Sequence, residues 1–494
     1  MSNPAIANAV NSQVGQQARF NEDWLALGIG LLIFALALSG LAGANLLGWV
    51  VSTSVWHAPA GALGPTAKSY AGLGGIGALL ATYVALLAVL SLGASLLKLR
   101  VGRFAAAFTV VFALAYLSWF VGNNAYLAAV TPADLQKFGI DWSLRLTNEG
   151  GFVVALIVGL VISNVFPRFA DWLKEAIRPE LYIKIAIVIL GGFIAVTIAG
   201  KLSLASSVLL RGLAAIVGAY LIYWAVVYFV ARKWFGFSRE WAAPLASGIS
   251  ICGVAASIAT GGAIRSRPAV PVLVSSLVVI FAVIEVLVLP FLAQAFLSHE
   301  PLVAAAWLGL AVKTDGAAVA AGGITEALIQ AKNAAEGIHY QSGWILGTTA
   351  TVKVFIDVFI GIWAFILAYI WTNHVNVQPG QPRARAGEIW ERFPKFILGF
   401  VATFLIGFWL ATTSSPDTLA KLTPSVGVAN TFRVIFFILT FFSIGVLSNF
   451  RKLWEDGLGK LVAVYVVSLF GFVIWVGLLV SWIFFAGVKP PLAN

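Results

Sequence analysis

Charged residues and cysteine are both scarce in this sequence of 494 residues. Only 10% of the residues are charged, whereas about 25% are charged in ordinary soluble domains. Hydrophobic residues make up 60% of the chain, and the mean hydropathy is +0.95. This composition excludes a soluble globular protein and indicates an all-α polytopic membrane protein. The single cysteine, Cys252, excludes an internal disulfide and a cysteine-based metal cluster.

Histidines and nucleotide-binding motifs are also few. The four histidines, His57, His299, His339 and His374, lie in predicted loops or span ends without ligand-like spacing, so we expect no metal site. No G-x-x-x-x-G-K-[ST] motif is present, which argues against an ATP site. We therefore expect a protein without cofactors that is not an enzyme.

Basic residues outnumber acidic ones, and the formal net charge is +11. The lysines and arginines fall in short loops between apolar runs, where they orient a membrane protein and do not indicate nucleic-acid binding. The first 23 residues lack the basic start and apolar core of a cleaved signal, so the first apolar run should remain as a span.

A bilayer-crossing helix needs about 20 mostly apolar residues. Three runs before residue 150 meet this criterion, namely Trp24–Leu41, Gly74–Leu97 and Phe104–Val121. Ten further crossings are predicted at 150–166, 181–199, 208–231, 244–264, 271–297, 303–324, 343–372, 394–412, 431–449 and 461–487. About 13 transmembrane helices result, and the charged loops predict a bacterial inner-membrane protein with a cytoplasmic N-terminus and an external C-terminus. Arg265 and Arg267 are the exception, because they lie outside if 244–264 crosses fully; a re-entrant segment would reverse this.

A glycine-rich stretch interrupts the run from Gly248 to Ile264. Its four glycines weaken a helix, and its hydroxyl side chains add polarity at bilayer depth, which together predict a broken membrane helix. Transporters bind substrates at such breaks. The alternative is that Gly248, Cys252 and Ala256, spaced by four, form a small-residue packing face between helices.

Short internal similarities suggest a repeat. Ser250–Val254 resembles Ser443–Val446, which places an interruption in the fourth crossing of each of two halves, 150–300 and 301–494. We therefore predict a ten-helix core of two inverted five-helix repeats, whose interrupted fourth helices meet near mid-membrane. Residues 1–149 form an N-terminal extension with three helices, which could make a homodimer interface or brace the core.

Five charged residues fall inside predicted crossings, where an ionised group costs about 2.5–3.5 kcal/mol on insertion scales. They are Glu285, Lys313, Asp315, Lys353 and Asp357. Lys353 and Asp357 share a helical face and could form a structural ion pair, whereas Lys313 and Asp315 point apart unless the helix unwinds. One carboxyl could remain protonated, which suggests proton coupling. Lysines beside the N–H groups of a broken helix suit an anionic substrate.

Four segments resemble, in order, those of the YeiH-type sulfate exporter family. They are Ser250–Ala259, Trp307–Gly309 leading to Ala320–Gly322, Pro394–Phe400, and Ile444–Arg451. The resemblance covers residues 150–494 and implies an inverted-repeat fold with crossed broken helices and the export or exchange of an inorganic sulfur oxyanion. The charged positions depart from the family pattern. Lys313-Thr314 stands where the family has His-Glu or His-Asp, and Glu285 where it has a small residue.

The predicted function is secondary active transport of a small inorganic anion, coupled to protons, with the lipid bilayer and the anion as partners. Candidate substrate-binding residues are Ser250, Cys252, Gly253, Ser257, Thr260, Lys313, Thr314, Lys353, Ser443 and Gly445. Candidate proton carriers are Glu285, Asp315 and Asp357. One alternative is a cation/proton antiporter. A remote one is an intramembrane hydrolase with Asp315 and Asp357 as an acid/base pair, although no G-x-S-x-G turn is present.

Overall fold

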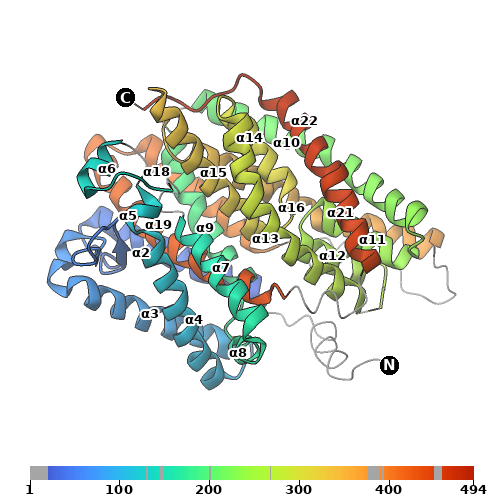
Figure 1. Cartoon of the computed structure of the whole chain (residues 1–494), viewed down its shortest axis with the longest axis horizontal. Coiled ribbons are helices and arrows are strands. Elements are labelled where there is room, and N and C mark those ends of the chain that lie inside the picture. Colours follow the sequence, from blue (N-terminus) through green and yellow to red (C-terminus); the bar gives the residue numbers. More distant parts are fainter. Residues whose placement is uncertain are drawn as a thin grey trace.

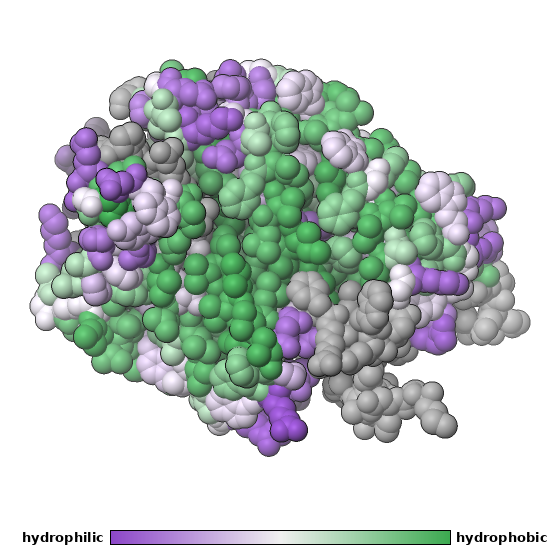
Figure 2. All heavy atoms as spheres, in the orientation of Figure 1, coloured by the Kyte–Doolittle hydropathy of each residue, from purple (hydrophilic) through white to green (hydrophobic). Residues whose placement is uncertain are grey.

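The computed structural model is almost entirely helical (Figure 1). It describes residues 21–129, 132–144, 150–199, 202–267, 269–375, 390, 394–449 and 459–493. Ten helices in these ranges are long and apolar enough to cross a membrane, or eleven if the bent pair formed by residues 150–165 and 167–173 counts as one span. The multi-pass all-α class predicted from composition is therefore confirmed. Figure 2 shows the apolar surface that such a protein presents to lipid, with hydrophilic residues gathered toward the edges of the view.

The three predicted N-terminal helices are present. They are α2 (Glu22–Ala37), which continues as the 3₁₀ helix η1 (Leu38–Ala42), α3 (Gly74–Leu96) and α4 (Val101–Gly122). The side chain of Asn21 accepts hydrogen bonds from the first free N–H groups of α2, which fixes where that helix begins. A small antiparallel sheet of β1 (Val51–Thr53) and β2 (Leu63–Pro65), followed by η2 (Lys68–Leu73), connects α2 to α3. Two short helices, α5 (Ala125–Ala128) and α6 (Pro132–Phe138), follow α4.

The remaining helices form the rest of the membrane core. In chain order they are α7 (Gly150–Val165), α8 (Pro167–Leu173), α9 (Pro179–Ile198), α10 (Leu202–Phe229) with the π-helical η4 (Val230–Trp234), α11 (Arg239–Ser250), α12 (Gly253–Ala263), α13 (Ala269–Leu297), α14 (Pro301–Ala311), α15 (Asp315–Ala335), α16 (Trp344–Ile370) with η5 (Trp371–Val375), α18 (Phe396–Thr413), α19 (Pro416–Leu447), α21 (Gly459–Ser468), η6 (Leu469–Val473) and α22 (Ile474–Phe485).

The predicted crossing at 244–264 is wrong, because α11 and α12 form a re-entrant hairpin, called hairpin 1 below. The Thr260 hydroxyl donates to the Ser247 hydroxyl at 2.7 Å, although 13 residues of straight helix would separate them by about 20 Å. At the open end, the backbone N–H and side chain of Arg267 donate to Glu240, which joins the beginning of α11 to the end of α12. Both ends of hairpin 1 therefore lie on one face of the molecule.

The predicted crossing at 303–324 is also a hairpin, formed by α14 and α15 and called hairpin 2. Gly309 and Gly322 both pack against Thr349 of α16, which is possible only if the chain doubles back between them. The long arm α15 returns beyond the start of α14, where the Asn333 amide donates to the Ser298 carbonyl at 2.9 Å. In Figure 1 the two arms lie side by side. Two of the thirteen predicted crossings are thus re-entrant.

Contacts between the loops show which helix ends lie on the same face of the molecule. The ion pairs Arg100–Glu175 and Arg178–Glu22 join loops on one face, whereas the Gly487 N–H donates to Glu300 on the other. We call the first the basic face, because its described loops and helix ends hold Lys98, Arg100, Arg103, Arg168, Lys174, Arg178, Arg232, Lys233, Arg239, Arg265 and Arg267. Hairpin 1 enters from this face and hairpin 2 from the opposite one. Arg265 and Arg267 therefore share a face with the other basic loops, and their predicted separation is wrong.

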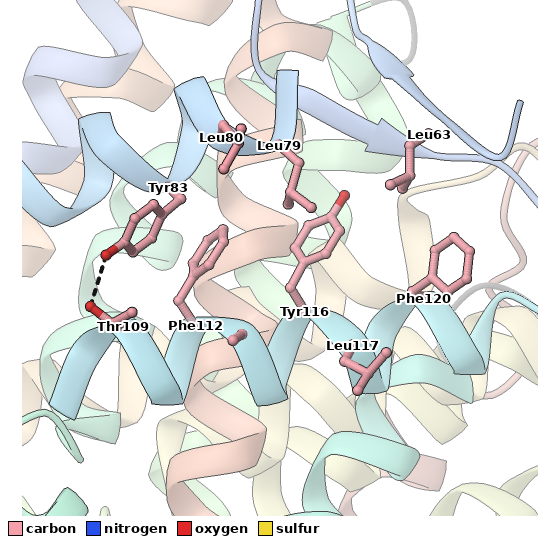
Figure 3. Close-up of a pocket in the computed structure, with 10 residues that line it drawn as sticks. Leu63, Leu79, Leu80, Tyr83, Thr109, Phe112, Tyr116, Leu117 and Phe120 are labelled. Carbon is pink, nitrogen blue, oxygen red and sulfur yellow. Dashed lines mark hydrogen bonds between the residues drawn. The ribbon is translucent and has the colours of Figure 1, made fainter. Parts of the chain in front are cut away.

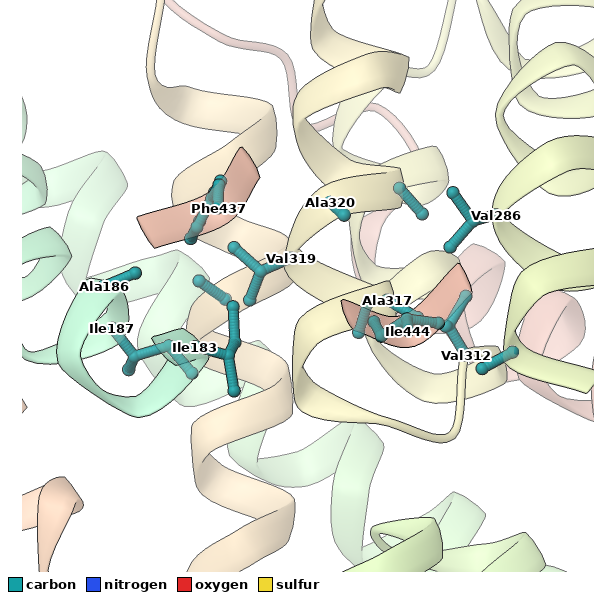
Figure 4. Close-up of a cluster of buried hydrophobic side chains, with 14 of the residues drawn as sticks. Ile183, Ala186, Ile187, Val286, Val312, Ala317, Val319, Ala320, Phe437 and Ile444 are labelled. Carbon is teal, nitrogen blue, oxygen red and sulfur yellow. The ribbon is translucent and has the colours of Figure 1, made fainter. Parts of the chain in front are cut away.

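The helices pack as two bodies. The frame body contains α2, α3, α4, α7, α8, α9, α18 and α19, and the hairpin body contains α10 to α16 with α21 and α22. They meet where α9 and α19 lie against α13, α15 and α16. Figure 4 shows that interface as a cluster of buried apolar side chains. Its labelled members are Ile183, Ala186, Ile187, Val286, Val312, Ala317, Val319, Ala320, Phe437 and Ile444. Three of these ten side chains are alanines, and none is polar.

Candidate functional site

The tips of the two hairpins meet inside the protein. The Gly253 N–H, at the start of α12, donates to the Lys313 carbonyl at the turn of hairpin 2, at 2.6 Å. Glycine at position 253 allows this close approach, since a Cβ would lie 1.9 Å from the Val278 side chain of α13 and one of the two would have to shift. The C-terminal ends of α11 and α14 and the N-terminal ends of α12 and α15 therefore converge on one place. Such ends leave backbone C=O and N–H groups without helical partners, so this place offers both acceptors and donors.

All five charged residues predicted inside the membrane gather around these tips, and each is at most 2% exposed. Lys353 of α16 joins the two hairpins. Its Nζ donates to the carbonyl of Ile251 at 2.9 Å and to that of Val312 at 3.3 Å. The nearest acid to this ammonium is Asp315, at 3.9 Å. The alternative ion pair with Asp357 on the same helix is therefore not the contact that Lys353 makes among the described residues.

Two carboxylates and the cysteine lie beside Lys353. The Cys252 thiol donates to Asp315 Oδ1 at 3.1 Å, and one ligand atom each of Cys252, Asp315 and Asp357 lies within 4.8 Å of the others. Neither carboxylate oxygen of Asp357 has a hydrogen-bond partner among the described residues. A buried carboxylate without a donor is costly unless it takes a proton or a cation. These three side chains could therefore hold a cation together, and Asp357 could hold a coupling proton.

Lys313 and Glu285 form the other side of the centre. The backbone N–H of Lys313 donates to Glu285 Oε2 at 3.0 Å, while Glu285 Oε1 has no described partner. The Lys313 ammonium donates to the Leu310 carbonyl and lies 4.7 Å from the centroid of the Tyr223 ring of α10. The unwinding predicted around Lys313 and Asp315 is present, because α14 ends at Ala311 and α15 begins at Asp315.

The predicted hydroxyl residues divide between the tips and the arms. Ser250 lies at the tip of hairpin 1, and its hydroxyl has no described partner. Thr314 caps α15 by accepting from the Ala317 N–H at 3.3 Å. Ser257 donates to the Gly253 carbonyl at 2.6 Å, and Thr260 links the arms farther from the tip. Thr260 therefore holds hairpin 1 together and does not line its tip.

The predicted second broken helix at Ser443 and Gly445 is wrong. Helix α19 runs without interruption to Leu447, and the second break lies in hairpin 2 instead. A Cβ on Gly445 would lie 2.3 Å from the Leu156 carbonyl of α7, so this glycine allows two frame-body helices to approach closely. Ser443 is fully buried in the same helix without a described hydrogen-bond partner. Ser443 therefore makes no hydrogen bond to the hairpin tips among the described residues.

Sequence reasoning missed the backbone carbonyls of Ile251 and Val312 and the Tyr223 ring. Carbonyls leave no signal in residue type, because they become ligands only where the chain unwinds. A tyrosine in an apolar helix is too common to single out. The predicted break in the helix was the signal that could have indicated these carbonyls, since the C-terminal ends of half-helices bind cations in transporters.

A cavity of about 530 Å³ opens between the two bodies, toward the face opposite the basic one. We call it the vestibule; its lining includes Phe193 of α9, Arg433 of α19 and Gly323, Glu326 and Gln330 of α15. Gly323 follows Asp315 by eight residues, or about 12 Å along α15. The apolar cluster of Figure 4 includes Val312 and Ala317 beside the turn of hairpin 2, and Val319 and Ala320 of α15 between Asp315 and Gly323 of the vestibule lining.

A second cavity, of about 540 Å³, is an apolar groove on the N-terminal helices, remote from the charged centre. Figure 3 shows Leu79, Tyr83 and Phe112 among its lining, with the Tyr83 and Thr109 hydroxyls hydrogen-bonded at 2.8 Å. The lining holds no charged residue. The groove is therefore formed by α3, α4 and Leu63 of β2 and is no part of the charged centre.

Comparison with known proteins matches this chain to membrane proteins. The family model described as conserved hypothetical protein 698 matches residues 139–464. A UPF0324 membrane protein of Nitrosomonas europaea is 40% identical over 494 residues, covering 98% of this chain and 100% of that protein. A UPF0324 membrane protein of Rhodopirellula baltica is 31% identical over 71% of this chain and 58% of its own. No solved structure matches the chain.

Proposed function

Because this chain belongs to the YeiH/UPF0324 family of membrane proteins, we propose that it is a secondary active transporter of a small inorganic anion, sulfate or sulfite in class, coupled to protons. The observation that carries the proposal is the meeting of two opposed hairpin tips at a buried charged centre. Re-entrant backbone at bilayer depth is tolerated only inside protein or beside a cavity, and in transporters it binds the substrate.

The two kinds of helix end at the breaks attract opposite charges: the C-terminal ends attract cations and the N-terminal ends attract anions. Lys353 neutralises the C-terminal ends of α11 and α14 by contacting the Ile251 and Val312 carbonyls. The N-terminal ends of α12 and α15 remain, and helix N-termini favour anions. Lys313 lies at the turn of hairpin 2, where its carbonyl accepts from the Gly253 N–H, and its amine would supply a positive charge when protonated. We therefore place the anion between these two N-terminal ends.

The net charge of the five buried groups couples anion binding to proton binding. Three carboxylates and two lysines leave one negative charge when all five are ionised, so an anion binds only after carboxylates take protons. Asp357 is the first candidate, because no described donor stabilises its charge. Anion and proton should therefore move in the same direction, which is equivalent to exchange of the anion for hydroxide.

Access to the centre requires the two bodies to move. The vestibule opens on the face opposite the basic one, and in this proposal the apolar cluster closes the remaining path to the tips. Rocking of the hairpin body against the frame body would open the centre to each face in turn. By the positive-inside rule, the basic face is proposed as cytoplasmic, which puts the N-terminus inside and the C-terminus outside an inner membrane.

The test is uptake of labelled sulfate and sulfite into proteoliposomes, with and without an inward proton gradient. Wild type should show gradient-driven uptake, and Lys313→Ala should lose at least tenfold of it, because the anion loses its charged partner. Lys421→Ala, at an exposed position of α19, is the control and should transport normally. Absence of uptake of both anions by folded, inserted wild type would remove the sulfur-oxyanion assignment.

Cation/proton antiport is the second candidate, and the cluster of Cys252, Asp315 and Asp357 favours it. The two functions predict opposite effects of pH. Anion binding should tighten as pH falls, since protonated carboxylates no longer repel the anion. Cation binding should weaken as pH falls, because protons and cations compete for the same oxygens. Measuring substrate affinity across pH therefore separates them.

A further inference from the structure

The Lys353 ammonium lies where an ion would be expected. Two main-chain carbonyl oxygens, of Ile251 and Val312, accept from it at 2.9 and 3.3 Å, and Asp315 Oδ1 lies at 3.9 Å. Asp357 lies one turn farther along the same helix, is 1% exposed, and has two carboxylate oxygens without described partners. Carbonyl and carboxylate oxygens are the ligands of hard cations.

Resting on the proposed function, we propose that Lys353 is a tethered replacement for a coupling sodium ion, and that the oxygen cage around its ammonium is an alkali-cation site. In transporters with broken helices, unwound carbonyls and half-helix C-terminal ends bind the coupling cation. Here the same two groups, one from each hairpin, bind a side chain of the protein itself. The ammonium supplies the positive charge that an ion would otherwise bring.

This assignment explains which ion is coupled. An ion site permanently filled by a lysine leaves no place for sodium, so protons on Asp315 and Asp357 are the remaining mobile charges. Lys353 is then the residue that determines coupling-ion specificity. Its position also holds the two hairpin tips together, as an ion bridging the two breaks would.

Removal of the amine tests the site directly. Lys353→Ala should free the cage, and the purified variant should bind radioactive sodium saturably and unfold at a temperature several degrees higher in sodium chloride than in choline chloride. Wild type should show neither effect, because its ammonium fills the site. Lys353→Met is the matched control: its stem occupies the same space without charge, so it should not bind sodium. Sodium effects of equal size in all three proteins, or in none, would overturn the proposal.

Lys353→Ala leaves its acids without a counter-ion, and it could fail to fold. The double variant Lys353→Ala with Asp357→Asn restores the charge count and keeps both carbonyls and Asp315. It should also be stabilised by sodium over choline, and a lack of response in this folded variant would contradict the cation site. Sodium binding is measured without transport, so failure here is distinct from failure of sulfate uptake, which would instead remove the proposed cargo.

Discussion

Substitution of Asp357 should change the stability of the protein and its proton coupling in opposite directions. Its carboxylate is buried without a described donor, whereas an asparagine amide is neutral and could donate to Asp315. We expect Asp357→Asn to raise the free energy of unfolding by about 1–3 kcal/mol, because a neutral amide replaces a buried carboxylate without a described donor. Anion uptake should lose its response to a proton gradient. Thermal unfolding and gradient-driven uptake check the two parts.

The control for this substitution is Asp417→Asn, at an exposed position in the first turn of α19. It should leave the gradient response unchanged. If Asp357→Asn keeps the full gradient response, Asp357 does not carry the coupling proton, and Asp315 or Glu285 must be tested in its place.

The charged residues of the centre were predictable from the sequence because a charge inside an apolar span is costly and therefore rare. All five lie around the hairpin tips. Their partners were not predictable, because Lys353 binds carbonyls rather than the acid four residues away. Lys313 likewise uses its backbone N–H, and not its ammonium, to contact Glu285. Which groups meet depends on the unwound backbone, and residue types do not encode it.

At the scale of elements, hairpin 1 depends on its close approach to α13. Gly253→Ala places a methyl group 1.9 Å from the Val278 side chain, so the tip must shift. We expect a loss of about 1–3 kcal/mol of stability, as in overpacked cores, and a fall in uptake of at least tenfold. Gly28→Ala in α2 meets no atom within 4 Å and should be harmless. Equal behaviour of the two variants would show that the tip position does not matter.

The open end of hairpin 1 should respond to acid. Burial raises the pKa of Glu240, but the backbone and side-chain hydrogen bonds from Arg267 outweigh it, and the pKa lies below its ordinary value. The stabilisation is therefore present above the ordinary glutamate pKa and is lost as pH falls through the lowered one. Hydrogen exchange of α11 and α12 should be slower in wild type than in Glu240→Gln at neutral pH, and equal at acid pH. If the two proteins still differ in exchange rate at acid pH, the Glu240–Arg267 hydrogen bonds are not what stabilises this end of hairpin 1.

Arm length explains why hairpins were harder to predict than helices. The arms of hairpin 1 contain 12 and 11 residues, which span about 16–18 Å and cannot cross a core of about 30 Å. Glycines mark a break but not its direction, so the interrupted stretch was consistent with either a crossing or a return. At Gly445 the same signal misled, because that glycine serves close helix packing. The uninterrupted N-terminal helices, by contrast, were placed correctly.

At the scale of the whole molecule, the two bodies must move relative to each other for transport. Gly316 of α15 and Thr440 of α19 face each other across the interface, with a Cβ on Gly316 3.0 Å from Thr440 Cγ2. A disulfide between Gly316→Cys and Thr440→Cys should abolish uptake when oxidised and restore it when reduced. The control joins Gly407→Cys to Ala195→Cys within the frame body and should transport in both states. Full activity of the oxidised first pair would exclude this motion.

The structure also corrects the predicted topology, that is, the face on which each loop lies. In the part of the chain that the structure describes, the basic loops up to Arg239 lie on one face, as predicted, and hairpin 1 returns Arg265 and Arg267 to that face. The basic loops at 376–389, 391–393 and 450–458 lie outside the described residues, and the cytoplasmic side remains a prediction. The division into repeats at 150–300 and 301–494 remains a prediction. Packing instead groups helices from both halves in each body, which sequence order alone could not reveal because contacts such as α9 with α18 join distant segments.

The central claim is that an anion and protons cross together through the hairpin centre. The most direct measurement is the lumenal pH of proteoliposomes when a sulfate gradient is imposed. We expect the lumen to acidify as sulfate enters, with no acidification in Asp357→Asn or Lys313→Ala. A lumen that keeps its pH under a sulfate gradient, and that changes pH only when a sodium or potassium gradient is imposed, would contradict anion transport and establish cation exchange.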